Sequence, residues 1–134
     1  MKNKYNNIIK NIRLNILNQY VTKFIITEGA YDHRGKKRDL NFDINKYSEF
    51  KDKIIYLPVN NFPNLNDPWN MLEYQRNYSM KEIEKFDDET YVIVSDVDEI
   101  PNPKKIKEFV KTKHKYGVFE QLFFYYKLNY LNNT

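Results

Sequence analysis

The 134-residue sequence contains no cysteine, which excludes disulfide bonds and thiolate metal sites. Its two histidines, His33 and His114, stand alone, so no spacing of histidines and carboxylates indicates a zinc or iron site. Only three glycines are present, and we find no phosphate-binding P-loop, no glycine-rich dinucleotide fingerprint and no Ser-His-Asp arrangement. These absences exclude the enzyme classes that those motifs define.

Long hydrophobic runs and strong charge of one sign are absent as well. No stretch approaches the ~20 apolar residues of a membrane span, and the basic start of the chain lacks the apolar segment of a signal peptide, so we expect a cytoplasmic protein without a transmembrane segment. The net charge of +4, with acids and bases interspersed, does not indicate a nucleic-acid partner. Hydrophobic residues make up 41% of the chain, which predicts a single domain over residues 1–134 with a core of its own.

Three carboxylates follow a predicted strand. Residues 91–94 (Tyr-Val-Ile-Val) are typical of a strand buried on both faces, and Asp96, Asp98 and Glu99 come directly after it. In an open α/β sheet, ligands bind outside the carboxyl ends of the strands. Asp96 and Asp98 point the same way on an extended backbone, and their oxygens suit Mg²⁺ or Mn²⁺. The pattern therefore predicts a divalent-metal site at the strand end.

The same carboxylates also have a purely structural interpretation. Acids at a strand end are often only solvated, and Asn102 followed by Pro103 indicates the N-cap and the first residue of a helix. A bare Asp-x-Asp pattern is also frequent by chance. The residues alone leave metal binding and a solvated loop open.

Helical and strand patterns alternate along the chain. Apolar spacing predicts helices at residues 5–20, 67–86 and 103–113, the second with Asp67 as N-cap and Pro68 at its first position. Short apolar runs predict strands at residues 23–27, 53–57, 89–95 and 117–128, with one helical turn at 47–50. Pro58 closes the second predicted strand. The alternation predicts an α/β fold with a mostly parallel sheet flanked by helices.

The loop after the first strand holds a cluster of cations. Residues 34–38 read Arg-Gly-Lys-Lys-Arg, and Gly35 and Lys36 at its centre could hold a diphosphate. The alternative is a solvated charge run. Glu28 ends the strand itself, and it could bond a sugar or ribose hydroxyl or pair with these cations.

Arg76 has two possible partners. Glu73 lies three residues earlier on the same helix face and could form a surface ion pair with it. Alternatively, Arg76 is buried toward the strand-end carboxylates or a bound phosphate. Near the end of the chain, Tyr125 and Tyr126 are expected in the core and rim of the last strand, or stacked on a sugar or base.

The segment Ser95-Asp96-Val97-Asp98-Glu99-Ile100-Pro101 resembles the Asp-x-Asp segment of glycosyltransferase family 17, the β-1,4-mannosyl-glycoprotein 4-β-N-acetylglucosaminyltransferase-like proteins. Other segments resemble the family in the same order, namely residues 24–28, 33–36, 53–55, 69–77 and 124–129. The resemblance covers about residues 13–131.

The resemblance implies a GT-A-like (Rossmann-like) nucleotide-sugar-binding core. It implies Mn²⁺- or Mg²⁺-dependent, inverting transfer of a sugar, N-acetylglucosamine, from a nucleotide-diphospho-sugar donor to a glycan or glycoconjugate hydroxyl. The implied metal ligands are Asp98 and Asp96, and the implied catalytic residues are Asp96, Asp98 and Glu99. The implied nucleotide-sugar-binding residues are Glu28, Gly35, Lys36, Arg76, Ser95 and Asp96.

The sequence departs from the family at both ends. No strand precedes residues 5–9 and few residues follow Asp98, so we expect an incomplete core whose general base is not identified, with Glu120 as a candidate. One alternative is a non-catalytic remnant that binds a nucleotide sugar or glycan. Another is a phosphatase of the haloacid-dehalogenase type, although its nucleophile loop needs Thr or Val where Ile100 stands. A structural α/β protein and any oligomeric state also remain open.

Overall fold

The computed structural model describes the backbone of residues 2–122 and the side chains of residues 7–122. Two parallel strands lie at its centre, β1 (Phe24–Gly29) and β2 (Ile54–Val59), paired in register from Phe24 opposite Ile54 to Gly29 opposite Val59. The helical elements are α1 (Lys2–Leu17), the 3-10 helix η1 (Ile44–Lys53), α2 (Pro68–Asn77), α3 (Met80–Ile83) and α4 (Pro103–Thr112). The predicted α/β class, with parallel strands flanked by helices, is therefore confirmed.

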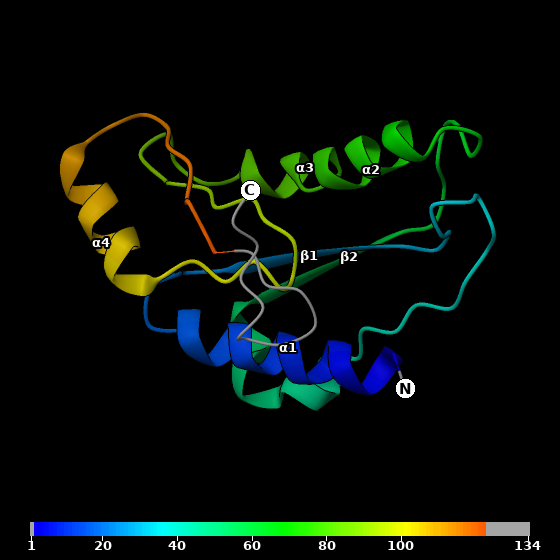
Figure 1. The fold of residues 1–134 in the computed structure, drawn as a ribbon, viewed down its shortest axis with the longest axis horizontal. Coiled ribbons are helices and arrows are strands. Elements are labelled where there is room, and N and C mark those ends of the chain that lie inside the picture. Colours follow the sequence, from blue (N-terminus) through cyan, green and yellow to red (C-terminus); the bar gives the residue numbers. More distant parts are fainter. Residues whose placement is uncertain (1, 123–134) are drawn as a thin grey trace.

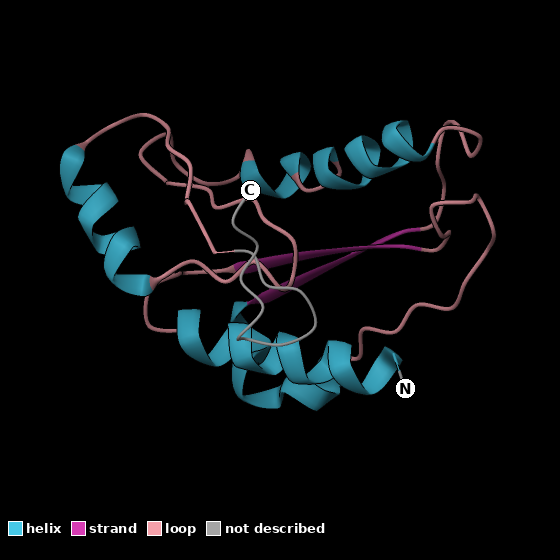
Figure 2. Cartoon of the chain, in the orientation of Figure 1, coloured by secondary structure: helices cyan, strands magenta, loops and turns pink. Residues whose placement is uncertain are grey.

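The helices cover both faces of the strand pair. Figures 1 and 2 show α1 and η1 below it, α2 and α3 above it, and α4 at the left. The core on the α1 side consists of buried side chains from several elements: Leu14, Leu17, Phe24, Phe42, Tyr47, Phe50, Ile54 and Ile106. On the other face, Gln75 of α2 donates from Nε2 to the Thr27 carbonyl at 3.4 Å. This contact holds α2 over the carboxyl-terminal half of β1.

Two helix starts confirm the capping predictions. The Asp67 carboxylate accepts from the backbone N–H of Trp69 at 2.9 Å, with proline at the first helical position of α2. The Asn102 side chain does the same for Lys104 at 3.0 Å at the start of α4. Such caps satisfy N–H groups that have no partner within the helix.

Two predicted boundaries were wrong. The single helix expected over 67–86 is divided, because α2 ends at Asn77 and a short helix, α3, follows. The Ser79 hydroxyl donates to the Arg76 carbonyl at 2.8 Å, a local bond that competes with the helical ladder. Pro58 does not close β2, which runs on to Val59, because proline is tolerated in a strand wherever its nitrogen has no ladder bond to make.

The third predicted strand, at residues 89–95, was wrong. These residues carry no strand, and within the described part of the chain no backbone hydrogen bond involves residues 91–94. The segment is also not buried on both faces, since Val94 is 69% exposed. Only Ile93 of this run packs against the core. An apolar run forms a strand only where a neighbouring strand accepts its ladder bonds.

The aromatic strand predicted at 117–128 is also wrong in the part that can be compared. Residues 117–122 carry no strand, and residues 123–128, with Tyr125 and Tyr126, lie outside the described residues. Phe119 packs against the core and so contributes to it from an irregular segment. None of the helices in the described part has the length and apolar character needed to cross a lipid bilayer.

Candidate functional site

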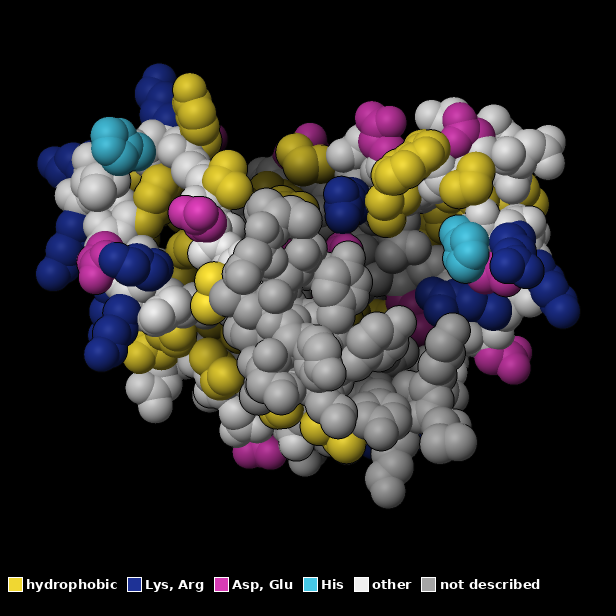
Figure 3. Space-filling view, viewed as in Figure 1, with side chains coloured by type: hydrophobic (Ala, Val, Ile, Leu, Met, Phe, Trp, Pro, Cys, Tyr) yellow, Lys and Arg dark blue, Asp and Glu magenta, His cyan; other side chains and the backbone are white. Residues whose placement is uncertain are grey.

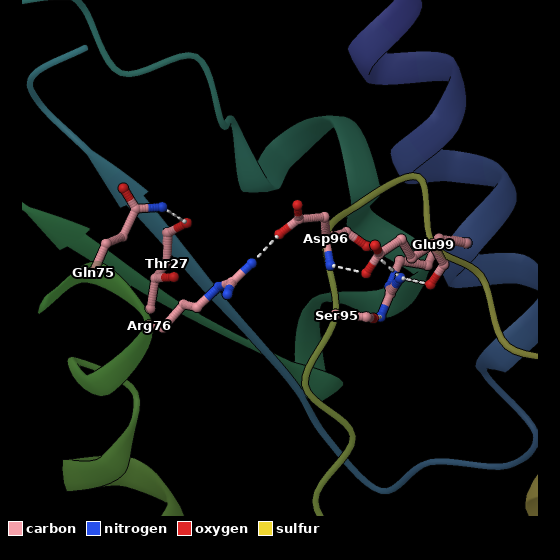
Figure 4. A network of polar contacts seen from close by, with 7 residues as sticks. Thr27, Gln75, Arg76, Ser95, Asp96 and Glu99 are labelled. Atoms are coloured by element: carbon pink, nitrogen blue, oxygen red, sulfur yellow. Dashed lines mark hydrogen bonds and ion pairs between the residues drawn. The ribbon is translucent and has the colours of Figure 1, made fainter. Parts of the chain in front are cut away.

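Residues 95–99 form a closed turn, which we call the acidic turn. The backbone N–H of Glu99 donates to the Asp96 carbonyl at 3.1 Å. In the opposite direction, the Asp96 N–H donates to Oε2 of Glu99 at 2.9 Å. Figure 4 shows Glu99 folded back on Asp96. Glu99 thus uses one carboxylate oxygen to hold the turn that it belongs to.

Arg13 of α1 binds the acidic turn from below. Its Nη1 donates to the carbonyls of Asp96 at 2.9 Å and Glu99 at 2.7 Å, and its Nη2 donates to the Ser95 hydroxyl at 2.6 Å. Partial burial lowers the pKa of the Arg13 guanidinium from its ordinary value, while the negative charges of Glu99, Asp98 and Asp96 oppose this shift.

The sequence interpretation missed Arg13. One signal was present, because Arg13 stands four residues after Ile9 and four before Leu17 and therefore lies on the apolar stripe of α1. An arginine on such a stripe needs acceptors inside the fold. Its acceptors are mostly backbone carbonyls, which leave no pattern in a sequence.

Arg76 reaches the acidic turn from the other side. Its Nη2 lies 3.1 Å from Oδ1 of Asp96, and Figure 4 shows the side chain extending from α2 toward that carboxylate. Of the two partners considered for Arg76, the structure has Asp96 and not Glu73, although no strand precedes this carboxylate. The pair is not buried, since the two side chains are 50% and 60% exposed. It is therefore accessible to a ligand.

Asp98 lies at the corner of the acidic turn with its side chain exposed. No hydrogen bond or ion pair to its carboxylate occurs among residues 7–122. The same residues contain no group of three His, Asp or Glu side chains able to hold a metal ion. In the acidic turn, Asp96 bonds Arg76 and Glu99 bonds a backbone N–H. Two carboxylates completed by substrate phosphates are a usual arrangement for Mg²⁺. Among the described residues the acidic turn is no all-protein cage, and Asp96 and Asp98 are the two carboxylates that it offers for such an arrangement.

Glu28 is placed elsewhere. It is 8% exposed and accepts from the N–H groups of Asn41 and Phe42 and from the Tyr56 hydroxyl, each at 2.9 Å. Burial alone would raise the pKa of the Glu28 carboxyl, but these bonds and the charge of Lys10 lower it overall. The carboxylate therefore has structural partners inside the fold.

Gly35 and Lys36 lie in a hairpin that follows β1. The Asp32 N–H donates to the Lys36 carbonyl at 2.8 Å, and the Gly35 N–H donates back to the Asp32 carbonyl at 2.9 Å. Gly35 has φ +72°, and an added Cβ would lie 2.6 Å from the Leu65 carbonyl oxygen, so this position requires glycine. Lys36 is exposed.

The structure thus joins some predicted site residues and separates others. Ser95, Asp96, Glu99 and Arg76 are linked through the acidic turn, with Asp98 at its corner. No hydrogen bond or ion pair among the described side chains links this turn to Glu28 or to the hairpin. Glu120 lines a hollow of about 330 Å³ together with residues that include Ile100, next to the acidic turn, and Lys105.

Comparison with known proteins identifies the family. The family model described as glycosyltransferase family 17 matches residues 4–131, nearly the whole chain. No curated protein and no solved structure shows a match. The match confirms the resemblance seen in the acidic segment, and a glycosyltransferase family implies a sugar donor and an acceptor as substrates. The chain belongs to glycosyltransferase family 17.

Proposed function

We propose that this chain transfers a sugar, N-acetylglucosamine, from a nucleotide-diphospho-sugar to a glycan hydroxyl with inversion at the anomeric carbon, using Mn²⁺ or Mg²⁺. The observation that carries the proposal is the acidic turn itself, which exposes Asp98 beside an Arg76–Asp96 pair of 3.1 Å. The parallel strands flanked by helices support a GT-A-like core. Family membership supports the reaction class.

Asp98 and Asp96 are the residues that would hold the metal ion. When bound, a divalent ion supplies Lewis-acid stabilisation of the diphosphate leaving group. Asp98 is free to take part at once, because its carboxylate is exposed and has no partner among the described side chains. Asp96 shares one oxygen with Arg76, which leaves the second oxygen available.

Arg76 is suited to hold the diphosphate. A guanidinium group offers several N–H donors in a planar fork that matches phosphate oxygens. Only one bond of Arg76 is used on Asp96, and half of the side chain is exposed. Lys36, exposed in the hairpin after β1, is proposed as a second cation for the donor.

We propose that the glycan acceptor binds beside α2. Trp69 is 80% exposed and lies seven residues before Arg76, so both project from the same side of the helix. Figure 3 shows hydrophobic side chains exposed at the upper right, over α2. An exposed indole offers a flat apolar surface with a polar tip, which suits a sugar ring.

Inverting transfer also needs a base that takes the proton of the acceptor hydroxyl. Glu99 and Glu120 are exposed carboxylates on or next to the acidic turn. Glu99 has one oxygen engaged by the Asp96 N–H and one oxygen left. We propose Glu99 first, because it belongs to the acidic turn.

The test is calorimetric titration of UDP-N-acetylglucosamine into the protein with and without Mn²⁺. Wild type is expected to bind in a metal-dependent manner, and Asp98→Ala is expected to weaken binding about 10-fold or more. Asp88→Ala is the matched control, since Asp88 is an exposed acid close in sequence that lies outside the acidic turn. Equal affinity of wild type and Asp98→Ala would overturn the metal site.

Turnover is tested separately. Release of UDP that depends on a glycan acceptor is expected for a transferase, and its loss in Asp98→Ala would link it to the acidic turn. Metal-dependent binding without any UDP release, across a panel of acceptors, would instead identify a nucleotide-sugar-binding protein without transfer activity.

A further inference from the structure

We propose that Arg13 is a positioning residue for the metal site, holding the acidic turn in the shape that presents Asp98 and Asp96. This inference rests on the proposed function. Among the described residues, Arg13 makes no hydrogen bond to a carboxylate oxygen, and its three acceptors there are the Ser95 hydroxyl and two backbone carbonyls. It therefore acts on the carboxylates through the backbone that carries them.

The three bonds bracket the turn. One acceptor, the Ser95 hydroxyl, belongs to the first residue of the turn. The last, the Glu99 carbonyl, belongs to the final residue, and the Asp96 carbonyl lies between them. A guanidinium group is planar and rigid, so it fixes the separation of its acceptors in a way that a lysine ammonium does not. One side chain thus sets the spacing across the whole acidic turn.

This arrangement leaves the carboxylates available. A cation that bound Asp98 or Asp96 directly would compete with a metal ion for the same oxygens. Arg13 places its charge beside three acids, whose negative charges act on it, while its hydrogen bonds go to neutral groups. It reduces the mutual repulsion of the acids and occupies none of their oxygens.

Apart from its two internal bonds and the packing of Ile93 and Ile100 on the core, the turn has few described contacts that hold it. Residues 91–94, which lead into it, make no ladder hydrogen bonds within the described part of the chain. The pair between Arg76 and Asp96 is half exposed, and exposed pairs contribute little to order. Arg13 is half-buried on α1, a helix whose Leu14 and Leu17 are in the core. Among the described polar contacts from outside the turn, those of Arg13 therefore connect it to a core helix.

The experiment compares Arg13→Met and Arg13→Lys with wild type in two measurements. The first is amide hydrogen exchange at Glu99, whose N–H donates inside the turn. The second is the affinity of the folded protein for Mn²⁺ in the presence of UDP. Arg13→Met is expected to lose amide protection and to weaken Mn²⁺ binding about 10-fold or more, the range seen when an outer-shell partner of a metal ligand is removed.

Arg13→Lys separates charge from geometry. It keeps the charge and the stem of the side chain, so it replaces Arg13→Met in the test if that variant fails to fold. Arg13→Lys is expected to recover only part of the affinity. Lys10→Met is the matched control, because it removes one positive charge from the same helix at a residue that packs on Phe42 and not on the turn. Its Mn²⁺ affinity is expected to equal that of wild type.

Three results overturn the proposal or separate it from its premise. Wild-type Mn²⁺ affinity in Arg13→Met, even with a lower melting temperature, would show that Arg13 only stabilises the fold. Wild-type affinity and protection in Arg13→Lys would show that the guanidinium geometry has no role. If wild type itself binds no Mn²⁺ with UDP, the proposed function is wrong, and the exchange of the Glu99 amide still decides whether Arg13 holds the turn.

Discussion

The carboxylate of Glu28 is buried, and hydrogen bonds from three donors stabilise its charged form. Its three donors lower the pKa of its carboxyl below the ordinary 4.5. A carboxyl with a lowered folded pKa contributes stability that is present above pH 4.5 and is lost as the pH falls through the folded pKa. We expect Glu28→Gln to lower the free energy of unfolding by about 1–3 kcal/mol at pH 7, since one N–H group loses its acceptor.

The measurement is urea unfolding of Glu28→Gln and wild type from pH 7 down to pH 3. The difference between the two proteins is expected to shrink as the carboxyl of wild type becomes protonated. Glu49→Gln, on the exposed side of η1, is the control and is expected to stay within about 0.5 kcal/mol of wild type. A difference for Glu28→Gln that stays constant over this pH range would contradict the assignment.

Glu99 combines a structural bond with the catalytic role proposed for it, and two substitutions separate them. Glutamine keeps an oxygen that can accept from the Asp96 N–H, whereas alanine removes the acceptor. If Glu99 is the base, Glu99→Gln is expected to keep Mn²⁺ and UDP affinity while losing at least about 100-fold in transfer rate. Glu99→Ala is expected to lose affinity as well. Full transfer activity in Glu99→Gln would show that Glu99 is only structural.

For single residues, the sequence predicts contacts between side chains better than contacts from a side chain to the backbone. The pairing of Arg76 with a strand-end carboxylate was one of two stated alternatives, because helix spacing and charge limit the choices for an arginine. The anchoring by Arg13 was missed, because its bonds go mainly to carbonyls, which every residue carries. That Gly35 helps to hold a diphosphate stays a prediction, and the close backbone approach at Gly35 in the structure is to Leu65.

Among the helices, the features that depend on local sequence were predicted and those that depend on the folded geometry were not. The starts of α2 and α4 were predicted correctly because an N-cap and a proline act within one turn of helix. The break after Asn77 was not predicted, because the hydroxyl of Ser79 bonds to the backbone only in the folded geometry. Local chemistry sets where a helix begins more clearly than where it stops.

The cap of α4 provides a direct test. Asn102→Ala removes the side-chain acceptor of the Lys104 N–H and is expected to lower the free energy of unfolding by about 1 kcal/mol. Asn102→Asp keeps an acceptor at the same position and is expected to be nearly neutral. Thermal or urea unfolding of both variants checks this. An equal loss in both would mean that the amide of Asn102, and not its oxygen, holds the helix start.

The architecture of the whole molecule could be predicted as a class but not as a count of strands. Helices alternating with apolar runs indicate parallel strands, and β1 and β2 have that arrangement. Whether a third run joins them depends on partners far away in the chain, which its own residues do not specify. Residues 91–94 have the composition of a buried strand but lie in a segment without assigned secondary structure, and most of them are exposed.

Native-state hydrogen exchange of the whole chain tests whether β1 and β2 are paired while residues 91–94 are not. The amides that join β1 and β2 are bonded in the centre of the fold, so we expect them to exchange only through global unfolding. The amides of residues 91–94 lack partners in the described part of the chain and are expected to exchange orders of magnitude faster. Because the same segment leads into the acidic turn, fast exchange there beside a protected Glu99 amide would show that the turn is ordered without a strand before it. Protection of residues 91–94 equal to that of β1 would contradict this account and restore the third strand that their sequence predicts.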